Sequence, residues 1–380
     1  MVAGLKERGE LADPRLEEAF LNVPRHIFLP EIPLEKAYTD DAITVKHDES
    51  GNAISSSSQP TMMALMLRQL RLEENQNVLE VGAGTGYNAA IMQYLVGPNG
   101  NVTTLEIDKE LTRQVRNNIQ QIGSGNIRVV HADGAMGYAP RAAYDRIIAT
   151  AGVWDIPKAW FDQLKPRGIV VAPIWVDAMQ YSAAFMEQGD GTFYSGRNLP
   201  CGFILMRGTD AGPRLGLRVG TSPLVLMAND VQEMDGGALH TLLSDDGEYN
   251  RLKQRLESNE YFSSVLPYLA LNMPETFHFA AYSLPPNQQI YGLNSNGFAV
   301  VGLASACFAP FNGVGETITY GAPDAFMMLQ GLMDDWEAAG KPSSSMLRLR
   351  LVPKDMDPPA INIGRLYERE HHYLHVWQAQ

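Results

Sequence analysis

Cysteine is scarce in this sequence, and its scarcity excludes two kinds of scaffold. Only Cys201 and Cys307 occur in 380 residues, with no CxxC pair and no metal-type spacing. A disulfide framework or a zinc site would need more cysteines at closer intervals. We therefore expect two buried free thiols and no metal ion.

Basic charge and long apolar runs are also lacking. The formal net charge is -13 at pH 7, from 30 Lys and Arg against 43 Asp and Glu. Because phosphate contacts require clustered basic side chains, this balance disfavours a nucleic-acid partner. The N-terminus has no apolar run of the signal-peptide type, and no later segment reaches membrane-spanning length. We expect a cytoplasmic protein with neither a nucleic-acid nor a membrane partner.

From Asn77 onward the sequence alternates regularly between strand and helix signals. Such alternation is typical of a doubly wound parallel sheet of the α/β class. A helix over 156–168, with Pro157 at its start and Gly168 at its end, leads into the fifth strand. Five short apolar segments are the predicted strands: 77–81, 101–107, 127–131, 144–149 and 168–175.

A length of 380 residues favours two domains. The alternation stops where the sequence becomes rich in glycine and proline, GTDAGPRLGLRVG (208–220). We therefore divide the chain into an N-terminal arm with an acceptor-binding loop (1–76), a Rossmann-like core (77–208) and an α+β extension (209–380) that we expect to recognise substrate.

Within the extension, periodicity and turn residues predict helices over 248–258 and 323–339 and strands over 346–352 and 372–377. Its histidines have no partners at ligand spacing, so we interpret each as a surface or core residue rather than a metal ligand. These are His240, His278, His371, His372 and His375.

The sequence VLEVGAGTGY (78–87) is an apolar strand that runs into a glycine turn and opens a helix. Glycines there let the backbone approach a ligand closely. Glu106 would end the next strand, where its carboxylate can accept hydrogen bonds from ribose hydroxyls. The spacing is GxGxG rather than the dinucleotide pattern GxGxxG, and Glu80 precedes the loop, where it can reach a cationic amine. We therefore favour S-adenosylmethionine as cofactor over NAD, and both over a purely structural turn.

Asp133 follows the third predicted strand, in the sequence His131-Ala132-Asp133-Gly134. From that place its carboxylate can bind an adenine amino group; the alternative is a solvated turn. With the glycine loop and Glu106 in register, we favour the adenine role.

Several stretches together resemble the protein-L-isoaspartate O-methyltransferases over about residues 10–208. They are VPRHIFLPE (23–31), AYTDDAI (37–43), SSQPTMMA (57–64), VLEVGAGTGYNAA (78–90), YDRIIATAG (144–152), IPKAWFDQLKPRGIVVAPI (156–174) and CGFILMRG (201–208). The resemblance implies a class I methyltransferase fold, S-adenosylmethionine as methyl donor and a peptide or protein carboxylate as acceptor. The cofactor-binding residues that we expect are Gln59, Glu80, Gly82, Ala83, Gly84, Gly86, Tyr87, Glu106, Ile107, Asp133, Gly134 and Thr150.

In that family a Thr-hydrophobic-Ser-Gln-Pro segment lies between cofactor and acceptor, and Ser58-Gln59-Pro60 matches its end. By resemblance, Ser58 would be the catalytic residue that orients the acceptor carboxylate, with Ser56, Ser57 and Asp40 shaping the pocket. Ser58 is also a suitable N-cap for a helix that begins at Pro60, and the two roles are compatible. No general base or metal is needed, because a carboxylate is already deprotonated at neutral pH.

Two departures from the family pattern bear on the acceptor. Residues 43–55 read ITVKHDESGNAIS where repair enzymes carry a Gly-rich apolar stretch similar to LPIGxGQT, and the chain continues for 172 residues beyond Gly208. An extended chain with a serine-rich loop and WEAAGKP (336–342) resembles the methyltransferases of ribosomally made, modified peptides, in which an aspartate is esterified and becomes an aspartimide. We favour such a precursor peptide as partner over isoaspartate repair. A third hypothesis is a binding protein that keeps the cofactor fold without transfer.

Overall fold

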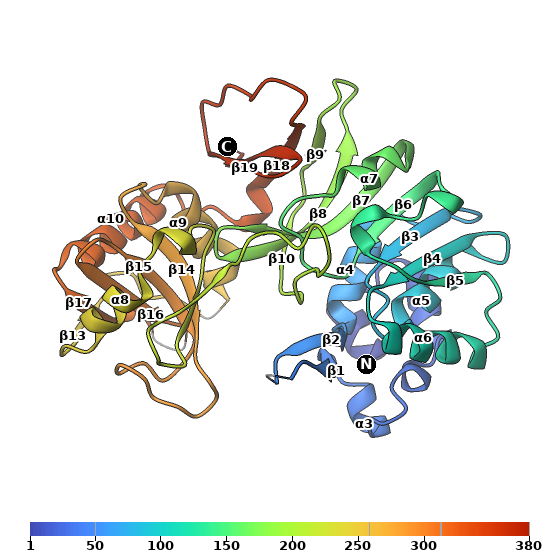
Figure 1. The fold of residues 1–380 in the computed structure, drawn as a ribbon, viewed down its shortest axis with the longest axis horizontal. Coiled ribbons are helices and arrows are strands. Elements are labelled where there is room, and N and C mark those ends of the chain that lie inside the picture. The colour runs from blue at the N-terminus through green and yellow to red at the C-terminus, as the bar shows by residue number, and fades with distance from the viewer. Residues whose placement is uncertain (50, 258, 312–313, 380) are drawn as a thin grey trace.

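A computed structural model describes residues 1–49, 51–257, 259–311 and 314–379 (Figure 1). The blue-to-green residues form one lobe and the yellow and orange residues form the other. The long strands β7 (Leu164–Val176) and β8 (Met179–Glu187) reach from the first lobe toward the second.

The first lobe is built on the predicted parallel sheet. Its strands β3 (Asn77–Val81), β4 (Asn101–Glu106), β5 (Ile127–His131) and β6 (Tyr144–Ala149) lie in the order β7-β6-β3-β4-β5. The prediction of a class I, Rossmann-like fold is confirmed. Because the order reverses at β3, which pairs with β6 on one side and β4 on the other, the carboxyl ends of these strands flank a crevice.

The helix predicted over 156–168 is mostly wrong. Only α7 (Lys158–Asp162) is helical, and β7 begins at Leu164 rather than at Gly168. Leu164 pairs with Tyr144, and a register shift separates this pair from the next one, Arg146 with Ile169. The Pro-Arg-Gly sequence that we interpreted as a helix stop is therefore the irregular part of a long strand, with Arg167 at φ 64°.

Helices α4 (Pro60–Leu70), α5 (Tyr87–Val96) and α6 (Lys109–Gln121) pack on this sheet. The side chain of Asp108 caps α6 by accepting hydrogen bonds from the amide groups of Glu110 and Leu111. The N-terminal arm contributes α1 (Val2–Glu7), α2 (Pro14–Asn22), α3 (Leu34–Ala37) and the hairpin of β1 (Ile43–His47) and β2 (Ala53–Ser57).

The second lobe contains a separate antiparallel sheet in the order β11-β12-β14-β15-β16-β17-β13. Its strands are β11 (Gly216–Arg218), β12 (Val225–Met227), β13 (Glu248–Arg251), β14 (His278–Ser283), β15 (Gly297–Val301), β16 (Ser305–Pro310) and β17 (Glu316–Gly321). The helices of this lobe are α8 (Gly236–Leu243), α9 (Leu266–Asn272) and α10 (Asp324–Ala338).

Two helices were predicted in this lobe, with different outcomes. The helix over 323–339 is confirmed as α10, with Leu329, Met333 and Trp336 fully buried. The helix over 248–258 is wrong: β13 occupies its first part because Glu248–Arg251 pair with β17 and form the edge of the sheet. Ser258, the last residue of that prediction, lies outside the described residues.

The chain then returns to the first sheet. Strand β18 (Leu347–Pro353) pairs with β9 (Phe193–Ser195), and β20 (His372–Gln378) and β19 (Arg365–Glu368) follow outside it. The red strands accordingly lie beside β9 in Figure 1. Residues 209–380 thus supply both the second sheet and the outer strands of the first.

Among the described residues, no helix combines the length and apolar character needed to cross a membrane.

Candidate active site

A cavity of about 410 Å³ opens where the strands β3, β4 and β5 end. The hairpin β1–β2 and the segment 200–207 complete its wall. Most of the predicted site residues line this cavity. They are Ser56, Ser57, Ser58, Gln59, Glu80, Gly82, Ala83, Gly84, Tyr87, Glu106, Ile107, Gly134 and Thr150. Asp40, Gly86 and Asp133 are not in its wall.

The glycine loop is packed too closely for side chains. Gly82 has φ 98°, and a Cβ there would lie 2.8 Å from Thr150 Oγ1. Gly84 has φ 55°, and its Cβ would lie 3.0 Å from the carbonyl oxygen of Ser56. Both positions therefore require glycine, which leaves the backbone as the surface of the cavity. Gly86 has a different function, since it precedes α5 and packs against Val115.

Glu80 is a fully buried carboxylate in the cavity wall. Its oxygens accept hydrogen bonds from Asn88 Nδ2 at 2.8 Å and Thr104 Oγ1 at 2.6 Å. Burial raises its pKa to about 7 despite these two bonds, which lower it. A cation placed next to Glu80 would restore its charged form, so this carboxylate is suited to a ligand amine.

Glu106 is held by the backbone of two loops. Its Oε2 accepts a hydrogen bond from the amide N–H of Gly84 at 3.1 Å, and its Oε1 accepts one from Asp108 at 3.0 Å. Burial raises the pKa of this carboxyl, while the two backbone bonds and the charge of Arg207 act in the opposite direction. The fixed carboxylate faces the cavity beside the glycine loop, where it can accept hydrogen bonds from hydroxyl groups.

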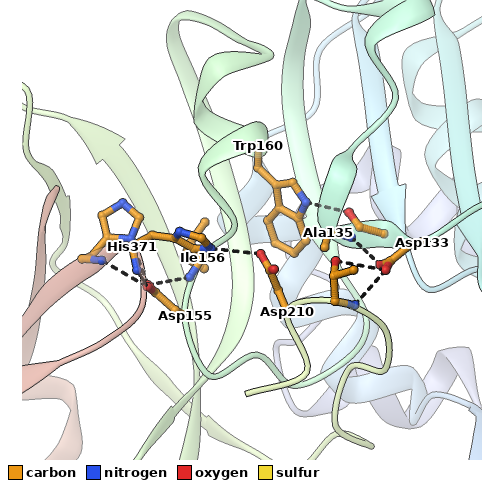
Figure 2. A network of polar contacts seen from close by, with 10 residues as sticks. Asp133, Ala135, Asp155, Ile156, Trp160, Asp210 and His371 are labelled. Carbon is orange, nitrogen blue, oxygen red and sulfur yellow. Dashed lines mark hydrogen bonds and ion pairs between the residues drawn. The ribbon is translucent and has the colours of Figure 1, made fainter. Parts of the chain in front are cut away.

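Asp133 lies next to the cavity but its carboxylate is engaged elsewhere (Figure 2). Oδ1 accepts a hydrogen bond from the amide of Ala135, and Oδ2 accepts two from Thr209, through its amide and its hydroxyl. Ala132 and Gly134, on either side, do line the cavity. The adenine-binding role of Asp133 stays a prediction, and the observed contacts show a carboxylate that fixes its own loop.

The segment predicted to bind the acceptor is held by a buried arginine. Arg25 is completely buried, and its guanidinium donates hydrogen bonds to the carbonyl oxygens of Thr39, Asp41 and Ser58 at 3.0–3.2 Å. It also lies 5.8 Å from the centre of the Tyr87 ring. Arg25 therefore connects the segment 39–41 to Ser58, which lines the cavity.

Ser58 does not cap α4, contrary to the alternative interpretation. Gln59 is the N-cap residue and makes no side-chain cap. Asp40 takes that role instead, accepting hydrogen bonds from the amide and the hydroxyl of Thr61, and it also pairs with Arg8 at 2.6 Å. Asp40 thus supports the helix start behind the cavity, which leaves the Ser58 hydroxyl free of a capping function.

The segment 200–207 contributes cavity residues to which the sequence assigned no role. It is fixed by two 2.8 Å bonds, from the amide of Gly152 to Ile204 and from the amide of Met206 to Gly152. Phe203 and Arg207 reach the cavity from it. The stretch CGFILMRG was part of the family resemblance, and only that resemblance could have indicated that this segment lies at the cavity.

Two histidines of the C-terminal extension, one in the second lobe and one in the turn between β19 and β20, have acidic neighbours that sequence spacing did not indicate. His371 lies with Asp210 and Glu370, and His278 lies with Asp230 and Glu233, each trio with its ligand-type atoms within 4.8 Å of one another. Glu370 precedes His371 in the sequence, but Asp210, Asp230 and Glu233 come from segments distant from the histidines they approach, so local spacing could not predict these groups.

Comparison with known proteins gives consistent matches. The family model "Protein-L-isoaspartate(D-aspartate) O-methyltransferase" matches residues 1–210. The chain is 38% identical over 211 residues to a protein-L-isoaspartate O-methyltransferase of Methanopyrus kandleri, covering 55% of this chain and 91% of the relative. A similarly named protein of Methanococcoides burtonii is 40% identical over 174 residues, 46% of this chain and 82% of the relative.

One solved structure is similar along the whole chain. It bears the name protein-L-isoaspartate O-methyltransferase, with a TM-score of 0.55 and 24% identity, and the match covers 100% of this chain and 98% of the other. At this identity the likeness shows the fold alone.

Proposed function

The chain belongs to the protein-L-isoaspartate O-methyltransferase family, and from this premise we propose that it methylates the side-chain carboxylate of an aspartate in a ribosomally made, modified peptide. The broader activity is that of an S-adenosylmethionine-dependent carboxyl O-methyltransferase with a protein or peptide acceptor. The proposal concerns which carboxylate is methylated.

The cavity fits S-adenosylmethionine on three observations. Its volume of about 410 Å³ lies in the range of small-molecule sites. The loop of Gly82 and Gly84 leaves no room for side chains, so a ligand can contact the backbone there. Two buried carboxylates, Glu80 and Glu106, offer acceptors for an amine and for ribose hydroxyls.

The bound cofactor would supply a methyl group on a positively charged sulfur, which is a strong electrophile. The acceptor carboxylate attacks without a general base because it is ionised at neutral pH. The work of the chain is therefore positioning: the Ser58 hydroxyl donates a hydrogen bond to the carboxylate, and the cavity wall excludes water. One carboxylate oxygen would gain that methyl group, with a neutral thioether as the leaving group. Attack of the next backbone nitrogen on the ester then releases methanol and closes the aspartimide.

The position of the hairpin β1–β2 is the observation that supports the proposed acceptor. The stretch 43–55, which departs from the Gly-rich pattern of repair enzymes, supplies strand β1 and the first residues of β2, and Thr44, Ala53, Ile54 and Ser55 line the cavity. The departure thus lies at the wall shared with the acceptor loop rather than at a remote surface. Because this part of the cavity wall differs in sequence from that of repair enzymes, we infer a different acceptor, namely an aspartate held in a constrained peptide.

Isoaspartate repair is the second candidate, and two observations favour it. The related proteins are named for that acceptor, and the similar solved structure, with the same name, extends over the residues beyond 208 as well. An extension is therefore compatible with either acceptor.

One experiment separates the two. The full chain is incubated with S-adenosylmethionine and three matched peptides, carrying isoaspartate, linear aspartate or aspartate in a constrained ring, and the masses are followed. Methylation followed by loss of methanol on the ring peptide alone is the expected result. Methylation of isoaspartate alone would establish repair, and cofactor binding without transfer to any peptide would favour the binding-protein hypothesis.

A further inference from the structure

The turn between β19 and β20 is fastened to the loop that follows β6. Asp155, only 5% exposed, lies in that loop. Its carboxylate accepts hydrogen bonds from the amides of His371 at 2.7 Å and His372 at 3.1 Å, and it pairs with His372 Nδ1 at 2.9 Å (Figure 2). Three of its contacts therefore come from a segment more than 200 residues away in the sequence.

From Asp155 the connection continues toward the cavity. The next residue, Ile156, donates its amide to Asp155 Oδ1, and Trp160 on α7 follows closely. Trp160 is fully buried, and its indole N–H donates to the carbonyl oxygen of Gly134 at 2.8 Å. Gly134 lines the cavity and packs so tightly on Val81 that a Cβ would lie 2.3 Å from it.

A second connection runs from the same turn to the same loop. His371 Nε2 pairs with Asp210 Oδ2 at 3.1 Å. The preceding residue, Thr209, donates to Asp133 Oδ2 through its amide at 2.8 Å and its hydroxyl at 3.1 Å. Figure 2 shows Asp210 between the histidines and Asp133. Both connections therefore end on the loop 132–135, one at Gly134 and the other at Asp133.

We propose that His371 and His372 are positioning residues for cofactor binding: the C-terminal strands hold the loop 132–135 in the conformation that forms the wall of the cavity. This inference rests on the proposed use of that cavity for S-adenosylmethionine. Neither histidine lines the cavity, and both act through Asp155, Trp160, Asp210 and Thr209. A loop that must be ordered on binding lowers affinity, whereas a loop ordered beforehand does not. The extension thus contributes to the cofactor site as well as to the second lobe.

The test compares His371→Ala/His372→Leu with His375→Ala in the full chain, in buffer with EDTA so that no bound metal contributes. His375 is a matched control because it lies on the same strand but contacts the carbonyl oxygen of Ile363 instead. For the double variant we expect the Kd for S-adenosylmethionine, measured by calorimetry, to rise about tenfold, with the acceptor KM and kcat at saturating cofactor unchanged. The control should bind as the unaltered chain does.

Two further measurements keep the outcome interpretable. Amide hydrogen exchange of residues 132–136 in the cofactor-free protein should accelerate in the double variant and not in the control. His372→Asn alone, which retains an N–H donor toward Asp155, should restore most of the affinity lost in His372→Leu. If the double variant does not fold, His371→Ala tests the connection through Asp210 by itself.

Unchanged exchange and unchanged Kd in folded variants would overturn the inference. A uniform loss of stability with equal changes in cofactor Kd, acceptor KM and kcat would also overturn it, since that is the signature of a purely structural role. If the unaltered chain failed to bind S-adenosylmethionine, the proposed function would fail, while the exchange measurement would still report whether the turn holds the loop.

Discussion

The two halves of the cavity differ in how they are assembled. The half with the glycine loop comes from the ends of neighbouring parallel strands, so that Glu80, Gly84 and Glu106 lie within 27 consecutive residues. The half with Ser58 comes from the hairpin β1–β2 and the segment 200–207, which are far apart in the chain. The first half is set by local sequence and sheet topology, and the second depends on tertiary packing.

The halves also differ in buried charge. The glycine-loop half contains two buried carboxylates, whereas the acceptor half is backed by the buried guanidinium of Arg25. Within the described residues, Arg25 has no carboxylate at ion-pair distance, and its positive charge is stabilised by carbonyl dipoles instead. One half therefore suits a cationic ligand and the other an anionic one, as a sulfonium donor and a carboxylate acceptor require.

The largest effect is expected at Arg25, which supports the half of the cavity that contains Ser58. Arg25→Met leaves three carbonyl groups without donors, so the free energy of unfolding should fall by about 3 kcal/mol in chemical denaturation. Arg146→Met is the matched control, because Arg146 also donates to backbone carbonyls but is only half-buried. Similar losses for both variants would show that burial at Arg25 adds nothing.

The next largest effect is expected at Glu106, in the half of the cavity that contains the glycine loop. In Glu106→Ala, the loss of a fixed charged acceptor should raise the cofactor Kd about 100-fold in calorimetry. The acceptor KM at saturating cofactor should stay the same. Glu110→Ala, an exposed acid in the first turn of α6, serves as control and should change the Kd little. A comparable rise in acceptor KM would contradict the division between the halves.

A smaller effect, expected at Ser58, tests the division between the two halves of the cavity from the acceptor side. Ser58→Ala removes one hydrogen-bond donor to the acceptor, and we expect kcat to fall about tenfold with the cofactor Kd unchanged. Ser124→Ala is a suitable control because Ser124 does not line this cavity and carries no predicted role. If Ser58→Ala weakened the cofactor as much as Glu106→Ala does, the assignment of Ser58 to the acceptor would be wrong.

The smallest effect is a pH dependence of cofactor binding. Burial raises the pKa of Glu80 to about 7, so the free protein holds a proton there at lower pH. A cationic amine binds the deprotonated form, and that form becomes scarcer below pH 7. The affinity should therefore decrease as pH falls from 7 to 6, by about fivefold. Glu80→Gln should bind more weakly at pH 7 and show a flatter profile, and an equally steep profile in that variant would exclude Glu80 as the titrating group.

The sequence predicted the part of the molecule in which neighbours in the chain are neighbours in space. The strands at 77–81, 127–131 and 144–149 have the predicted bounds, because short apolar segments between turn residues leave little freedom in register. The same locality placed Glu80, Glu106, Gly82 and Gly84 at the cavity.

The failures share a cause in long-range pairing. Glu248–Arg251 carries charged and polar residues with helical spacing, yet it forms a strand because β17 offers it an unpaired edge. The carboxylate of Asp133 is held by Thr209, a contact that spacing cannot indicate, while its adenine-binding role stays a prediction. The partners of His371 and His372 likewise come from distant loops.

The pairing of β18 with β9 has a consequence for synthesis on the ribosome. Strand β9 ends at Ser195, and its partner begins at Leu347, about 150 residues later. At roughly 5–20 residues per second, the growing chain keeps that sheet edge unpaired for about 8–30 s. Open edges invite pairing with other chains. A nascent chain therefore passes through an interval in which a chaperone that shields β9 would raise the yield of correctly folded protein.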